Sequence, residues 1–121
     1  MVHFVGAGSG APDLITLRGM RLLGQADVII YAGSLVNPQL LAYKKEDAVV
    51  YNSAAMTLEE VLAVMEQAEQ EGKDTLRLHT GDPCLYGAIR EQMDALDARG
   101  IAYDDTPGVS SFQAAAAALN L

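Results

Sequence analysis

His79-Thr80-Gly81-Asp82-Pro83-Cys84-Leu85-Tyr86-Gly87 is a polar hinge between a strand-like and a helix-like stretch. Residues 75–78 before it are typical of a short strand, and the apolar residues after it recur at helical spacing: Leu85, Ile89, Met93 and Leu96. The hinge therefore follows the carboxyl end of a strand, the edge of an open parallel sheet where ligands bind. Gly81 can adopt backbone angles closed to other residues, and Pro83 restricts Asp82 to an extended conformation. We expect the Asp82 carboxylate to stay outside the helix, where a ligand hydroxyl or ammonium group can meet it.

Strand-like and helix-like segments alternate along the rest of the chain. Strand character recurs in five stretches, at 2–5, 27–31, 48–51, 75–78 and 101–103. Helices are predicted between them: one capped by Asp13 and ended by Gly24, a short one over 37–42, one from Thr57 to Gly72, and one ending near Gly100. This alternation predicts a parallel five-stranded α/β sheet flanked by helices on both faces.

Three of these segments carry specific packing predictions. The first helix is expected to turn Leu14, Leu17 and Leu22 inward. Thr57 and Glu60 have the spacing of a capping box, and one stripe of the helix that follows is apolar: Leu58, Val61, Leu62, Met65 and Ala68. The strand at 27–31 lacks polar alternation, so it should be buried on both faces.

Size and composition bound the class of protein. The 121 residues suffice for one domain, and because the chain stops at 119–121 in what resembles a helix end, we expect a fragment. The 16 acidic and 8 basic residues give a net charge of −8, which opposes nucleic-acid binding. Cys84 is the single cysteine, and His3 and His79 lack ligand spacing, so we predict neither a disulfide nor a metal site. Without a membrane-length apolar run or a signal-type N-terminus, the chain is expected to be soluble and cytoplasmic.

The first glycine-rich turn allows two interpretations. Gly6, Gly8 and Ala11 match the spacing of a dinucleotide fingerprint, so the domain of an oxidoreductase is an alternative function. That fingerprint also calls for an acidic residue at the end of the second strand, whereas Asp27 lies at its beginning. Pro12 removes a backbone donor from the turn. A tight turn that lets a helix pack closely on the sheet explains the glycines equally well.

Three stretches together resemble one family, the tetrapyrrole methylases that use S-adenosylmethionine. They are 5–16 around the glycine turn, the hinge at 80–87, and Pro107-Gly108-Val109-Ser110-Ser111, in matching strand-loop-helix contexts. Within this family, the stretches at 31–36 and 79–83 are most similar to the subgroup that methylates precorrin-4 or cobalt-precorrin-4 at C11 in cobalamin biosynthesis.

The resemblance implies a two-domain homodimer with a tetrapyrrole substrate and a cofactor cleft between the domains. This chain would be the N-terminal domain, residues 1–121, with the C-terminal domain absent and the isolated domain inactive. Carried onto this sequence, the cofactor contacts are Ser9, Thr80, Gly81, Asp82, Leu85, Ser110 and Ser111. Gly8, Gly10 and Tyr86 would face the substrate.

Departures from the family pattern limit what can be assigned. Relatives often carry proline at the position of Ser9 and an acid at that of Ala11. Siroheme-forming relatives have an aspartate after the second strand, assigned to proton transfer, where this chain has Ala32-Gly33-Ser34. The sequence therefore identifies no general base.

Local sequence leaves simpler roles open for the same residues. Asp82 can cap a helix, Ser110 and Ser111 can serve a helix start, and Tyr86 can be a packing residue. A third function, a non-catalytic regulatory or assembly module, is compatible with the short length and the missing base.

Overall fold

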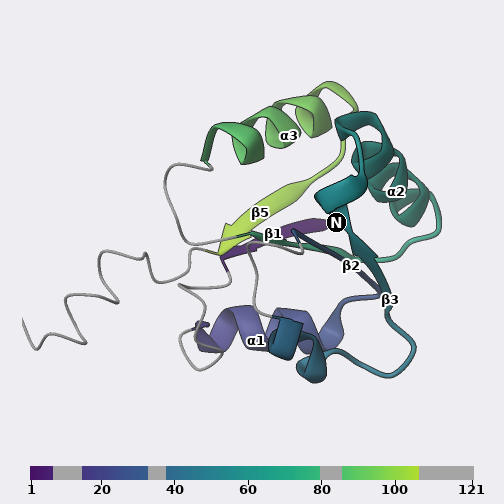
Figure 1. Cartoon of the computed structure of the whole chain (residues 1–121). Coiled ribbons are helices and arrows are strands. Elements are labelled where there is room, and N and C mark those ends of the chain that lie inside the picture. The colour runs from purple at the N-terminus through teal and green to yellow at the C-terminus, as the bar shows by residue number, and fades with distance from the viewer. Residues whose placement is uncertain (7–14, 33–37, 80–85, 107–121) are drawn as a thin grey trace, which may run out of the picture.

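The fold is an α/β sandwich in which one sheet lies between two layers of helices (Figure 1). The computed structural model describes residues 1–6, 15–32, 38–79 and 86–106. The strands are β1 Val2–Gly6, β2 Val28–Tyr31, β3 Val49–Asn52, β4 Thr75–His79 and β5 Tyr103–Thr106. The α-helices are α1 Leu17–Gln25, α2 Leu58–Gln70 and α3 Tyr86–Ala98, and two 3-10 helices are η2 Pro38–Tyr43 and η3 Ser53–Ala55.

The five strands form a single sheet in the order β3-β2-β4-β1-β5. Each neighbouring pair runs parallel, as the register shows for β1 with β4 and β5, and for β2 with β3 and β4. The predicted fold class, a parallel five-stranded sheet flanked by helices, is confirmed. The order places β4 between β1 and β2, so β1 and β2 are not neighbours in the sheet although they are consecutive in sequence.

Apolar side chains bury both faces of the sheet. Helices α2 and α3 cover one face (Figure 1), over a core of Val2, Phe4, Val28, Ile30, Val61, Leu62, Met65, Ala68, Ile89, Met93, Leu96 and Ile101. Helices α1 and η2 cover the other, over Val5, Leu23, Ala26, Ile29, Leu40, Ala48, Leu76 and Leu78. Strand β2 contributes to both cores, which confirms its predicted burial.

Helix α2 begins and ends as its sequence predicts. The Thr57 amide donates to Glu60 Oε1 at 3.1 Å, and the Glu60 amide donates to Thr57 Oγ1 at 3.2 Å. These reciprocal bonds form the capping box and satisfy two free donors of the first turn. The helix ends before Gly72, whose φ of 70° is the left-handed conformation that glycine adopts at low cost.

Helix α1 differs from the prediction in its start and in its inward face. Its N-cap is Thr16, whose Oγ1 accepts from the Gly19 amide at 3.0 Å, and it runs through Gly24. Leu17 is 81% exposed, so its predicted inward position is wrong. The buried positions are Gly19 and Leu23, one turn apart, and Leu17 lies about 200° around the helix from Gly19. Asp13 and Leu14 lie outside the described residues.

The fifth strand begins two residues later than predicted. Ile101 is buried, and its amide donates to the Leu96 carbonyl at 3.0 Å, so it closes the end of α3 and does not belong to the sheet. Strand β5 instead contains Asp104 and Asp105, which an edge strand can carry because one of its sides is open to solvent. Strand β2 begins one residue later than predicted, and β3 begins and ends one residue later than predicted.

Candidate functional site

The carboxyl ends of four strands share one edge of the sheet, here called the carboxyl rim. Gly6 of β1 lies opposite His79 of β4, and Val5 lies opposite Thr106 of β5. Tyr31 of β2 lies opposite Leu78 of β4. The undescribed segments that contain the three glycine turns therefore follow strands that end on the same rim. Gly8, Gly81 and Gly108 themselves lie outside the described residues.

The rim has a topological switch point between β1 and β4. The two strands are neighbours, yet the helix after β1 covers one face of the sheet and the helix after β4 covers the other (Figure 1). Connections that leave adjacent parallel strands in opposite directions open a crevice above the strand ends, where open α/β sheets bind ligands. Gly6, at the end of β1, adds no side chain to this opening. The switch point therefore makes this rim the candidate ligand site.

The predicted site residues belong almost entirely to undescribed segments. The cofactor contacts Ser9, Thr80, Gly81, Asp82, Leu85, Ser110 and Ser111 lie outside the described residues, as do Gly8 and Gly10. Tyr86 begins α3, and its backbone alone is described. All of these assignments stay predictions.

Sequence reasoning missed a buried arginine directly beneath the rim. Arg77 in β4 is 7% exposed, and its Nε donates to Oε1 of Gln92 in α3 at 3.2 Å. Its Nη1 donates to the Leu78 carbonyl at 3.1 Å and to the Ile30 carbonyl at 3.5 Å. Burial lowers the pKa of Arg77 to about 10, so the guanidinium remains charged at neutral pH. The signal in the sequence was a basic residue between two apolar residues of a strand.

Histidine and aspartate side chains pair on both faces near β5. His79 Nε2 lies 3.7 Å from Asp105 Oδ1, with the histidine side chain 16% exposed. On the other face, His3 Nδ1 lies 2.8 Å from Asp104 Oδ1, and Arg18 Nη2 lies 3.9 Å from Asp104 Oδ2. Within the described part of the chain, no three histidine, cysteine or acidic side chains are grouped to hold a metal ion. No described helix has the length and apolarity to cross a membrane.

The strand order gives the dinucleotide alternative no support. That site needs the end of the second strand beside the first, whereas β4 separates β1 from β2 by about 10 Å, two strand spacings. Asp27 lies at the opposite rim, where its Oδ1 accepts from Lys45 Nζ at 2.5 Å and its Oδ2 accepts from the Asp74 amide at 2.9 Å. The bond from Lys45 and then that from Asp74 hold the pKa of Asp27 below its usual value.

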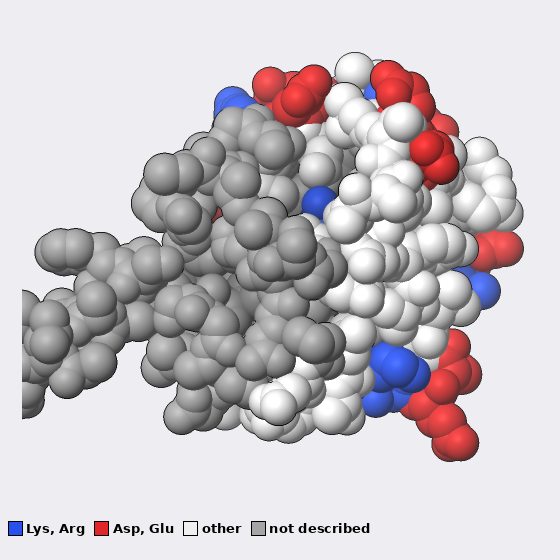
Figure 2. Space-filling model, viewed as in Figure 1, with Lys and Arg blue, Asp and Glu red and all other residues white. Residues whose placement is uncertain are grey.

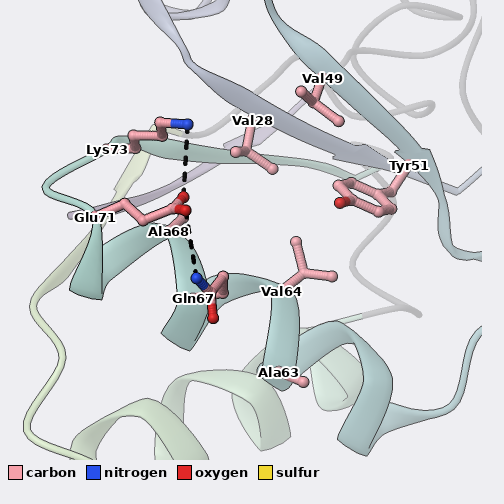
Figure 3. Close-up of a pocket in the computed structure, with 9 residues that line it drawn as sticks. All are labelled: Val28, Val49, Tyr51, Ala63, Val64, Gln67, Ala68, Glu71 and Lys73. Atoms are coloured by element: carbon pink, nitrogen blue, oxygen red, sulfur yellow. Dashed lines mark hydrogen bonds and ion pairs between the residues drawn. The ribbon is translucent and has the colours of Figure 1, made fainter.

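A hollow lies between β3 and α2, away from the rim (Figure 3). Its volume is about 300 Å³, and it is lined by Val28, Val49, Tyr51, Ala63, Val64, Gln67, Ala68, Glu71 and Lys73. Glu71 accepts from Gln67 at 3.3 Å and lies 3.5 Å from Lys73, so these polar groups satisfy one another. Val28 and Val49 begin their strands, which places the hollow toward the amino ends.

Comparisons with known proteins agree with the observed fold and show the family. Residues 1–121 match the family Tetrapyrrole (Corrin/Porphyrin) Methylases. A cobalt-precorrin-4 C(11)-methyltransferase of Methanocaldococcus jannaschii is 56% identical over 99% of this chain and 46% of its own length. The crystal structure of a cobalt-precorrin-4 methyltransferase superposes with a TM-score of 0.92 at 50% identity, over 98% of this chain and 50% of that one.

A third relative was solved with a ligand. The uroporphyrin-III C-methyltransferase of Thermus thermophilus, in complex with S-adenosylhomocysteine, superposes with a TM-score of 0.75 at 32% identity. That match covers 94% of this chain and 47% of the other. The chain therefore spans about half the length of the relatives that it matches.

Proposed function

The chain belongs to the tetrapyrrole methylase family, and from this premise we propose that it is part of an S-adenosylmethionine-dependent methyltransferase. Its substrate would be precorrin-4 or cobalt-precorrin-4, methylated at C11 in cobalamin biosynthesis. The observation that carries the proposal is the switch point between β1 and β4, because the two motifs that resemble the family follow these strands. Relatives at 50% identity or more that bear this activity in their names support the choice of substrate.

The proposal extends to the whole protein and its cofactor. This chain would be the N-terminal domain of a two-domain enzyme, and the enzyme would be a cytoplasmic homodimer. The relative solved with S-adenosylhomocysteine supports S-adenosylmethionine as the cofactor. Ser9, Thr80, Gly81, Asp82, Leu85, Ser110 and Ser111 would hold it, and Gly8, Gly10 and Tyr86 would face the tetrapyrrole.

The chemistry asks mainly for positioning. When bound, S-adenosylmethionine would supply a methyl group on a sulfonium. An electron-rich ring carbon would attack this methyl group in line, and the bond to sulfur would break to release the thioether S-adenosylhomocysteine. Asp82 would anchor a polar part of the cofactor, and the glycine turns would let a flat ring lie close to the backbone. A proton left on the substrate carbon still needs an acceptor, and we assign that role to no residue.

Calorimetric titration with S-adenosylhomocysteine tests the proposal on the complete polypeptide that carries this sequence. We expect one site, and we expect Asp82→Ala to weaken binding about tenfold or more, since it removes hydrogen bonds to a charged group. Asp94→Ala is the matched control, because Asp94 is an exposed acidic residue of α3 that pairs with Arg90. Failure of the unmodified protein to bind would refute the methyltransferase.

Protection against thermal unfolding separates the two candidate cofactor classes. A ligand that binds the folded state alone raises the unfolding temperature, so S-adenosylhomocysteine should do so and NAD(H) or NADP(H) should not. The reverse pattern would revive the oxidoreductase domain.

A further inference from the structure

We propose that Arg77 is a positioning residue of the methyl-transfer site, acting through a buried tie to Gln92. This inference rests on the proposed function, because it concerns the segment 80–85 that would hold the cofactor. The tie consists of the Arg77 guanidinium, the Gln92 side-chain oxygen, and the carbonyls of Ile30 and Leu78. It therefore joins β2, β4 and α3, three elements that end or begin at the carboxyl rim.

The location of the tie relates it to the cofactor segment. Arg77 and Leu78 immediately precede the end of β4 at His79, and Gln92 lies in the second turn of α3, which begins at Tyr86. Six residues, 80–85, connect these two elements. A tie across β4 and α3 therefore fixes the separation of the two described ends that this connection must span.

A charged side chain is not needed to fill the space that Arg77 occupies. Burial of a guanidinium is costly, and within the described part of the chain the partners of Arg77 are neutral oxygens. An apolar residue would fill the same place under α3 without that cost. A planar fork with five donors can bind groups on several elements at once, which neither an apolar side chain nor a lysine does.

The experiment uses variants that separate geometry from charge. Arg77→Lys keeps the charge and loses the fork, and Gln92→Leu removes the acceptor on α3. Gln92→Glu keeps an acceptor for Nε while it neutralises the buried charge. Arg90→Lys is the control, because Arg90 is 61% exposed and pairs with Asp94 within α3.

Two measurements on the complete polypeptide carry the test. The first is the dissociation constant of S-adenosylhomocysteine, taken well below the unfolding temperature of each variant. We expect it to rise about tenfold in Arg77→Lys and Gln92→Leu, as for the loss of one positioning hydrogen bond, and to stay within about twofold in Gln92→Glu and Arg90→Lys. The second is amide hydrogen exchange at Leu78, His79 and residues 90–93 in the second turn of α3, which should accelerate in the first two variants alone.

The outcomes discriminate between the possible roles. If the unfolding temperature falls while affinity stays constant, Arg77 is merely structural and the inference is wrong. If Gln92→Glu weakens binding while Arg77→Lys does not, the charge matters and the positioning does not, which also overturns it. If the unmodified protein fails to bind S-adenosylhomocysteine, the proposed function is wrong. If hydrogen exchange at the rim is the same in Arg77→Lys and Gln92→Leu as in the unmodified protein, the Arg77–Gln92 bond does not position the rim and the inference is wrong, whatever the protein binds.

Discussion

At the residue scale, the Asp27 carboxylate links neighbouring segments at the rim opposite the candidate site. Asp27 bonds to Lys45 from the segment before β3 and to the backbone of Asp74 before β4, so it links the amino ends of the strands around it. Its folded-state pKa lies below the usual value, chiefly because of the bond from Lys45. A group of this kind stabilises the fold above its unfolded pKa of about 3.9, and this contribution is lost as the pH falls through the lower folded pKa.

Asp27→Ala should therefore destabilise the domain in a pH-dependent way. We expect a loss of about 1 kcal/mol at pH 7, because the variant lacks the bonds from Lys45 and from the Asp74 amide, and a smaller difference between variant and parent below pH 4. Urea denaturation at pH 7 and pH 3 measures both quantities. Lys45→Met is the control for the ion pair alone, and it should have the smaller effect because it leaves the backbone bond in place. An equal loss at both pH values would contradict the assignment.

At the element scale, the closeness of α1 to the sheet depends on one glycine. A Cβ on Gly19 would lie 2.9 Å from Cγ1 of Val5 in β1, closer than carbon atoms pack. A Cβ on Gly24, in the same helix, would lie 3.4 Å from the Tyr43 carbonyl oxygen, which is ordinary contact. Alanine at either position gains helix propensity, but only at Gly19 does it also crowd the sheet. Comparing the two variants therefore separates the effect of helix propensity on stability from the effect of packing.

Gly19→Ala and Gly24→Ala should therefore shift stability in opposite directions. Alanine favours a helix by up to about 1 kcal/mol over glycine, and Gly24→Ala should gain part of that. Gly19→Ala should lose about 1–3 kcal/mol overall, because overpacking against β1 outweighs the propensity. Chemical denaturation of both variants provides the comparison. Stabilisation by Gly19→Ala would show that α1 can shift away from β1 without cost.

Helices and strands were predicted correctly where nearby residues determine them and wrongly where contacts between distant residues do. The capping box at Thr57 and Glu60 is local, and its helix was predicted with its start, its end and its buried stripe. Strand β5 was misplaced because Asp104 and Asp105 oppose strand propensity, and their pairing with His3 and His79 is invisible locally. Leu17 was predicted to face inward because it is apolar and lies at helical spacing from the other leucines. The face that packs on the sheet is instead the one that carries Gly19, which apolar periodicity does not mark.

The candidate site likewise has features that local sequence predicts and features that depend on contacts between distant segments. Strands β1 and β4 and helix α3, which flank the segments predicted to form the site, could be identified from periodicity, because that pattern is local. Arg77 could not be assigned a role, because its partners Gln92 and Ile30 come from other elements. Contacts between distant segments depend on strand order, which the sequence pattern leaves undetermined.

At the scale of the whole molecule, strand order distinguishes the proposed methyltransferase site from a dinucleotide site. Both sites follow a glycine turn after β1, and an alternating α/β pattern is compatible with either. Insertion of β4 between β1 and β2 brings His79, at the end of β4, beside Gly6, at the end of β1, and moves the end of β2 away. Strand order therefore gives the dinucleotide alternative no support, although the glycine spacing alone permits it.

Strand order also determines the two edges of the sheet. The edge strand β5 carries Asp104 and Asp105, and charged side chains oppose pairing with another chain. The edge strand β3 exposes Val49 and Tyr51, 49% and 37% accessible. Figure 2 shows charged side chains along the upper and right-hand margins of the described surface, and a mostly uncharged band at the level where Figure 1 shows the sheet. An uncharged edge strand is a site for unwanted association.

Val49→Lys should therefore reduce aggregation during refolding with little change in stability. Val49 faces the open hollow beside α2, so a charged side chain there stays in solvent. Val50→Lys is the matched control on the same strand, because Val50 packs against the opposite core and a lysine there should destabilise by about 1–3 kcal/mol. Light scattering during refolding and urea denaturation measure the two effects. An equal loss of stability in both variants would show that Val49 is part of the core, because only a buried position responds to charge in that way.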